Sequence, residues 1–160
     1  MSTLIKPVIL SIIVSFLYSC SGDKSNADKL RDKYSAAPEP KTLAEAEAKW
    51  KDYKGVGPVT NLEIPAEIDQ TLATSGGEIF EAKCTAGHKA EKRFIGPAPK
   101  GIMERRTPEW IMNMILNPEE MVQKDPIGKQ LLVEYNGSPM ANQNLTQEEA
   151  RAVLEYFRTL

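Results

Sequence analysis

The stretch Cys84-Thr85-Ala86-Gly87-His88 places a cysteine four residues before the only histidine of the chain. Side chains four residues apart lie on one face of a helix, so this thiol and this imidazole can come close together. Because the chain has a single histidine, a zinc or di-iron site built from several histidines is excluded. Any chemistry of the protein therefore depends on very few residues, and this stretch contains two of them.

The sequence around this stretch predicts helices with clear start signals. Gly76-Gly77 precedes an apolar-periodic segment. At four later points a capping residue is followed by proline or, in the last case, by glutamate within the first turn. Those four points are Thr107-Pro108, Asn117-Pro118, Asp125-Pro126 and Thr146-Gln147-Glu148-Glu149. The last helix carries an apolar stripe at spacings of three and four residues, made of Ala150, Val153, Leu154, Phe157 and Leu160. No convincing strand pattern is found, so residues 75–160 are predicted to form a small all-α domain.

Residues 75–160 resemble the class I c-type cytochromes, in which two cysteines and a histidine form the haem-attachment motif C-x-x-C-H. Here Gly87 replaces the second cysteine. Gly96-Pro97 matches the family's loop at the proximal imidazole, and Ser138-Pro139-Met140 matches its sixth-ligand segment. The positions that pack the family's first helix on its last are Gly77, Phe80 and Tyr156. The resemblance implies a cytochrome c-like helical domain around one haem.

The resemblance also implies roles for individual side chains. Cys84 would form a thioether to the haem, His88 would bind the iron, and Met140 would bind it from the opposite face. The second ring nitrogen of His88 would donate to the carbonyl of Pro97. Ligation by His and Met leaves no open iron position, which suits electron transfer, and the thioether raises the reduction potential. Trp110 is expected either to donate its indole N–H to a haem propionate or to belong to the core.

Gly87 is the main departure from the family pattern. With one cysteine in the motif, at most one thioether can form, from Cys84. Three outcomes are open: haem c attached through Cys84 alone, non-covalent haem held by His88 and Met140, or no retained haem. Glycine also lowers the stability of a helix by roughly 0.5–1 kcal/mol relative to alanine.

The N-terminal residues are typical of a targeting segment. Lys6 precedes an apolar run over 7–19, which is shorter than the about 20 residues of a membrane-spanning helix and typical of a signal peptide. The run ends in Leu17-Tyr18-Ser19-Cys20, which resembles a bacterial lipoprotein box with Cys20 as the acylated residue. The alternative is a plain secretory signal with an incidental Cys20. A lipid on Cys20 would hold the protein on a membrane facing the periplasm, with the outer membrane favoured.

Four segments are therefore predicted along the chain. They are a lipoprotein signal peptide over 1–19, a lipid-anchored flexible tether over 20–53, an N-terminal strap over 54–74 and the haem domain over 75–160. The tether is predicted because its first part alternates charges and has too few apolar residues to order its backbone. A short helix over 43–50 is compatible with its Ala- and Glu-rich composition.

Composition excludes other classes of protein. The 160 residues include 20 Lys and Arg against 22 Asp and Glu, a balance that gives no support for nucleic-acid binding. Two cysteines cannot build a disulfide-rich scaffold. A loose basic group follows the histidine and suits either an acidic redox partner or, slightly favoured, a solvated face. It consists of Lys89, Lys92, Arg93, Lys100, Arg105 and Arg106.

The combined pattern favours a monomeric electron carrier over an enzyme. It would move one electron between a quinol-oxidising complex and a terminal reductase or oxidase of a respiratory chain. The alternative is a haem-free lipoprotein module that binds another protein through its helical surface, and Gly87 is its main support. A thiol enzyme with Cys84 as nucleophile and His88 as base is the least favoured, since no third orienting residue is evident.

Overall fold

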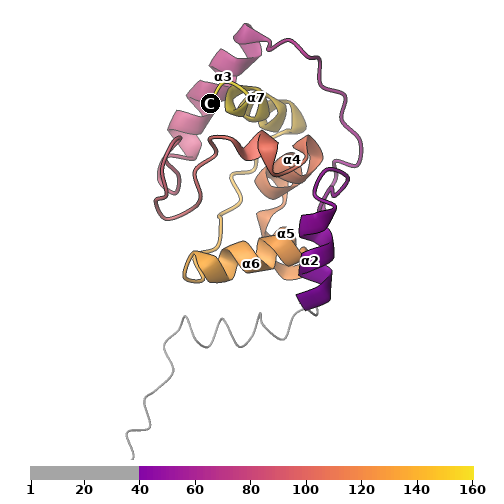
Figure 1. Ribbon diagram of the computed structural model, residues 1–160. Coiled ribbons are helices and arrows are strands. Elements are labelled where there is room, and N and C mark those ends of the chain that lie inside the picture. The colour runs from indigo at the N-terminus through magenta and orange to yellow at the C-terminus, as the bar shows by residue number, and fades with distance from the viewer. Residues whose placement is uncertain (1–39) are drawn as a thin grey trace, which may run out of the picture.

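The computed structural model describes residues 40–160 of the chain (Figure 1). The predicted signal peptide, Cys20 and residues 20–39 of the predicted tether lie outside the described residues. The elements are helices α2 (Pro40–Ala48), α3 (Gln70–Lys83), α4 (Pro108–Leu116), α5 (Pro118–Lys124), α6 (Pro126–Glu134) and α7 (Gln147–Phe157), with a short 3-10 turn at Ile102–Glu104. Residues 40–160 contain no strand, which confirms the predicted all-α fold. None of the helices in this range is long and apolar enough to cross a membrane.

Capping side chains precede α3, α4, α6 and α7, whereas the predicted cap Asn117 makes no such hydrogen bond at the start of α5. Thr107 accepts a hydrogen bond from Trp110 N at the start of α4, and Asp125 does the same for Gly128 N at the start of α6. Thr146 and Glu149 form the predicted capping box of α7. The first helix of the domain starts earlier than the predicted limit at residue 75, because Asp69 caps it by accepting from Leu72 N. Gly76-Gly77 therefore lies inside α3 instead of preceding it.

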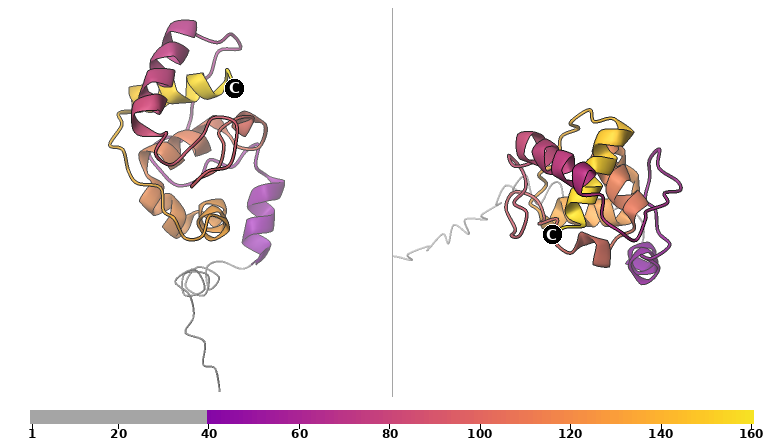
Figure 2. Two further views of the ribbon diagram at one scale, coloured as in Figure 1. Left: turned by 90° about the vertical axis from the view of Figure 1, so that its left-hand side faces the viewer. Right: turned by 90° about the horizontal axis from the view of Figure 1, so that it is seen from above.

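Helices α3 and α7 cross in close contact at one end of the domain, while α2, α5 and α6 lie at the other end, with α4 between them (Figures 1 and 2). At the crossing, a Cβ built on Gly76 would lie 1.9 Å from the carbonyl oxygen of Ala152. Gly77 sits against Tyr156, and the Phe80 ring lies 5.4 Å from the Tyr156 ring. The predicted packing positions are therefore at the crossing, but the closest backbone contact is made by Gly76, which sequence analysis missed.

The segment before α3 packs across the domain. The buried amide of Asn113 on α4 accepts from Val59 N at 2.9 Å and donates to the carbonyls of Lys54 and Val59, both at 2.9 Å. The buried carboxylate of Glu109 accepts from Leu62 N at 3.2 Å. Because helix α4 supplies partners for these backbone groups, residues 54–62 of the predicted strap lie fixed along it, while residues 70–74 belong to α3.

The described part of the predicted tether differs from the prediction. Helix α2 packs on α6, Ala46 is only 5% exposed, and Leu43 and Tyr53 pack against the core. Arg106 also pairs with Glu47, with 2.9 Å between Nη2 and Oε1. Residues 43–53 therefore belong to the folded domain. The low local hydrophobicity of this segment concealed this, because its few apolar side chains pack against the core formed by the rest of the domain.

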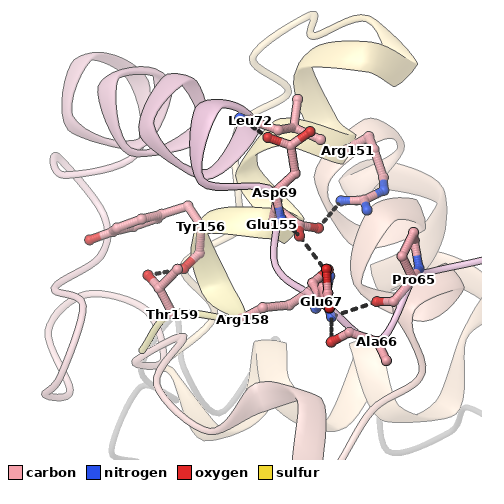
Figure 3. Close-up of polar contacts among 10 residues, drawn as sticks. All are labelled: Pro65, Ala66, Glu67, Asp69, Leu72, Arg151, Glu155, Tyr156, Arg158 and Thr159. Carbon is pink, nitrogen blue, oxygen red and sulfur yellow. Dashed lines mark hydrogen bonds and ion pairs between the residues drawn. The ribbon is translucent and has the colours of Figure 1, made fainter.

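A buried ionic cluster fastens the last part of the strap to α7 (Figure 3). Glu155 is fully buried and lies between two cations, 2.5 Å from Arg151 Nη1 and 2.6 Å from Arg158 Nη1. It also accepts a hydrogen bond from Asp69 N at 2.8 Å, and Arg158 donates to the carbonyls of Pro65 and Ala66. Breaking a buried pair of this kind leaves an uncompensated charge, which costs several kcal/mol.

We expect stability to depend on pH through Glu155. Burial raises the pKa of this carboxyl, but the hydrogen bonds from Arg158, Arg151 and Asp69 N and the charge of Arg151 lower it more, so the folded-state pKa is below the ordinary value. The stabilisation is therefore present above the ordinary Glu pKa of about 4.3 and is lost as pH falls through the folded-state value. Glu155→Gln should lose about 3 kcal/mol of unfolding free energy at neutral pH.

The measurement is denaturant unfolding of the holoprotein against pH for wild type, Glu155→Gln and the control Glu81→Gln, which changes an exposed carboxylate on α3. The difference between wild type and Glu155→Gln should shrink below about pH 4. A difference that is the same at every pH would contradict this role of Glu155.

Candidate haem site

A cavity of about 380 Å³ lies in the middle of the domain, enclosed by α3, α4, α6, α7 and the loops that follow α3 and α6. Cys84 and His88 line it from the end of α3 and the turn beyond, Trp110 lines it from α4, and Met140 lines it from the loop before α7. The rest of the lining is mostly apolar and includes Phe80, Ile95, Pro99, Ile102, Ile111, Met114, Ile115, Val122, Leu131, Leu132, Val153 and Phe157. The fold therefore gathers a thiol, an imidazole and a thioether, distant in sequence, around one apolar space.

The imidazole of His88 is oriented by a contact of one ring nitrogen. Its Nδ1 lies 2.8 Å from the carbonyl oxygen of Pro97, the contact that the family resemblance implies. A carbonyl oxygen can only accept, so Nδ1 is the donor in this contact and Nε2 is the ring nitrogen that is left to bind a metal. A neutral imidazole oriented through one nitrogen is the usual state of a histidine that binds a metal through the other.

Gly96 is needed for the close approach of its loop to His88. A Cβ built at this position would lie 2.5 Å from Cε1 of the imidazole, well inside van der Waals contact. Gly96 N also donates to the carbonyl of Gly87 at 2.8 Å, which closes the loop over the histidine. A side chain at position 96 would force the imidazole to move. This steric limit explains why the predicted pocket residue at position 96 is a glycine.

Gly87 faces a different environment. A Cβ built there would meet only the carbonyl oxygen of Cys84, at 3.9 Å, and its backbone lies outside the left-handed region that favours glycine. Residue 87 lines the cavity together with Cys84. The local structure thus has room for a cysteine at position 87, and nothing in it requires glycine.

Cys84 is half-buried at the C-cap of α3, and its carbonyl accepts from the backbone N–H groups of Gly87 and His88. Burial raises the pKa of the thiol, while the charge of Lys83 opposes this less strongly. Raising the thiol pKa lowers the fraction of thiolate, which is the nucleophilic form. This environment argues against the thiol-enzyme interpretation.

Trp110 is almost fully buried, and its ring forms part of the cavity wall. Its indole Nε1–H donates to Asp125 Oδ1 at 3.3 Å. Asp125 uses this donor in the structure, which favours the core interpretation of Trp110 over its interpretation as a propionate donor. The reason is Asp125, an N-cap residue whose second role could not be read from local sequence.

Several members of the basic group after His88 are paired with acidic side chains. Arg93 contacts Glu134, and Lys100 Nζ lies 2.6 Å from Glu91 Oε1. The Lys100 ammonium lowers the pKa of Glu91, mainly through their hydrogen bond. This pairing supports the solvated-face interpretation for much of the group.

Residues 73–160 match the family model for cytochrome c, and the chain belongs to this family. It is similar to the cytochrome c from Rhodothermus marinus, with 41% identity over 76% of this chain and 96% of that chain and a TM-score of 0.62. It is also similar to an engineered cytochrome c from Rhodothermus marinus, Rma TDE, with 45% identity over 64% of this chain and 89% of that chain and a TM-score of 0.62.

A third structure, of Rma TDE bound to a carbene intermediate, has 46% identity over 64% of this chain and 88% of that chain, with a TM-score of 0.60. No curated protein sequence matches the chain. The family and its solved members support a class I c-type cytochrome that binds haem and carries electrons. The apolar cavity and its imidazole, thioether and thiol groups fit that cofactor.

Proposed function

We propose that this protein is a membrane-tethered mono-haem electron carrier in which His88 and Met140 are the axial ligands and Cys84 forms a single thioether. The observation that carries the proposal is that these three side chains line one apolar cavity while Pro97 leaves His88 Nε2 available. When bound, the haem supplies one-electron chemistry at an iron whose potential the two axial ligands set.

The residues of the chain position the group and control its surroundings. Pro97 orients the His88 ring and increases its basicity as a ligand, and Gly96 allows this contact. Met140 supplies a soft sulfur, which favours the reduced state of the iron. The apolar wall excludes water, which keeps the local dielectric low and the reorganisation on electron transfer small.

The location and partners are proposed from the sequence. Cys20 would carry the lipid, the residues between Cys20 and α2 would link the anchor to the domain, and the domain would face the periplasm, with the outer membrane favoured. There the monomer would carry electrons from a quinol-oxidising complex to a terminal reductase or oxidase. The redox partners are proteins of the respiratory chain.

Haem retention tests the proposed attachment. The full chain is expressed in a periplasm with a c-type maturation system, and its visible spectrum is recorded before and after extraction with acidified acetone. We expect wild type to keep its haem after extraction and Cys84→Ser to lose it. Gly87→Cys, for which the structure has room for the added Cβ, should raise the yield of haem-containing protein severalfold. The matched control Gly87→Ala adds a Cβ without a thiol and should not.

The other outcomes are equally decisive. Haem that is bound but fully extracted would contradict the thioether and leave a non-covalent site at His88 and Met140. Colourless protein from both wild type and Gly87→Cys would contradict haem binding altogether and favour the haem-free binding module. Colour restored only by Gly87→Cys would mean that Gly87 impairs a cytochrome.

A further inference from the structure

Asp125 is a buried carboxylate directly behind the wall of the cavity. It caps α6, has no exposed surface, and accepts from Gly128 N at 2.7 Å and from Trp110 Nε1 at 3.3 Å through Oδ1. Both donors line the cavity, whereas Asp125 does not. Asp125 therefore contacts the haem site through the residues that form its wall.

The carboxyl group of Asp125 has few polar partners. Within residues 40–160, Oδ2 is the one buried side-chain oxygen or nitrogen without a hydrogen-bond partner. No cation of the described residues pairs with Asp125; Arg106, whose guanidinium stacks 5.4 Å from the Trp110 ring, is paired with Glu47. A negative charge on this carboxyl group would act through a low-dielectric interior, where its field is only weakly screened.

The strap supplies a second neighbour of the same carboxylate. Burial raises the pKa of Tyr53, and a contact with Asp125 raises it further, so the Tyr53 hydroxyl stays protonated near this charge. The hydroxyl of Thr107 donates to the carbonyl oxygen of Tyr53 at 2.6 Å. The oxygen of that Thr107 hydroxyl also accepts a hydrogen bond from Trp110 N. Trp110 is thus held by Asp125 at its ring and by Thr107 at its backbone, and Tyr53 contacts both of these partners.

We propose that Asp125 is a positioning residue of the haem site that fixes the Trp110 indole in the cavity wall and lowers the reduction potential of the bound haem. This inference rests on the proposed function. Oxidation of the iron adds one positive charge, and a nearby buried negative charge favours that state. The N-cap role alone would not require the contact with Trp110, since a hydrogen bond to Gly128 N is sufficient for a cap.

The test is a redox titration of the holoprotein carrying Asp125→Asn. Asparagine keeps an acceptor oxygen for Gly128 N and Trp110 Nε1 but removes the charge. We expect the ratio of reduced to oxidised protein at a fixed applied potential to rise severalfold, with the haem absorption bands unchanged. The control Glu120→Gln removes a partly exposed carboxylate on α5 that pairs with Lys124, and it should leave the ratio unchanged.

An unchanged ratio in Asp125→Asn, or an equal rise in Glu120→Gln, would overturn the proposal. If Asp125→Asn fails to fold, Tyr53→Phe is measured instead: it removes one donor near the carboxylate and should lower the ratio, and no change would overturn the proposal. Failure of the proposed function is recognised separately. In that case the wild type itself lacks the spectrum of a six-coordinate haem, whereas failure of this inference alone leaves that spectrum intact.

Discussion

Reduced protein carrying Met140→Ala is expected to bind carbon monoxide and to have a reduction potential lower than that of wild type by on the order of 0.1 V. Met140 lines the cavity from the loop before α7, and alanine is too short to reach a haem iron held by His88. Loss of the thioether opens one coordination position and removes the ligand that stabilises the reduced state. Axial ligands set haem potentials over a range of about 0.8 V, so this is among the largest single-residue effects available.

The matched control is Met114→Ala. Met114 also lines the cavity, but from α4, and it packs against the core. Met114→Ala should lower the stability of the protein, but the reduced variant should not bind carbon monoxide. The measurements are the spectrum of the reduced protein with and without carbon monoxide and a redox titration. If Met114→Ala gained carbon monoxide binding and Met140→Ala did not, Met114 would be the sixth ligand and the assignment of Met140 would be contradicted.

The second large effect is on stability and falls on Gly76. A methyl group at this position would lie 1.9 Å from Ala152 O and 2.8 Å from Val153 N, and both are backbone atoms that cannot rotate away. Gly76→Ala must therefore separate α3 from α7. We expect a loss of about 3 kcal/mol or more, a large part of the 5–15 kcal/mol that stabilises a typical domain.

Gly77→Ala is the matched control for this prediction, since it lies one residue further along the same helix. A Cβ there would contact the Tyr156 ring at 3.4 Å, an ordinary van der Waals distance. Alanine should then be neutral or stabilising by up to about 1 kcal/mol, because it favours helix over glycine. Thermal unfolding of the two holoproteins measures the difference. Equal destabilisation by both substitutions would contradict the assignment of this effect to the close contact of Gly76 with α7.

Local sequence was sufficient for the helical class of the fold and most helix starts. A capping side chain acts on backbone groups two or three residues away, so Thr107, Asp125 and Thr146 could be interpreted without knowledge of the rest of the chain. The order of motifs around His88 also predicted which residues would meet, because the family resemblance supplied the long-range contacts. Residues 43–53 were assigned to the tether, whereas they pack on the domain, since their few apolar side chains contact a core formed by segments far away in the sequence.

The sequence by itself determined the candidate thiol, imidazole and thioether, because the chain has one histidine and one cysteine in a family-like motif. Only the tertiary structure decided that Gly76 makes the closest helix contact, that Gly87 has space for a side chain, and that Trp110 donates to Asp125. These three facts depend on distances between segments far apart in the chain. Local composition and periodicity report which face a residue occupies, whereas steric room and hydrogen-bond partners depend on how the packed helices meet.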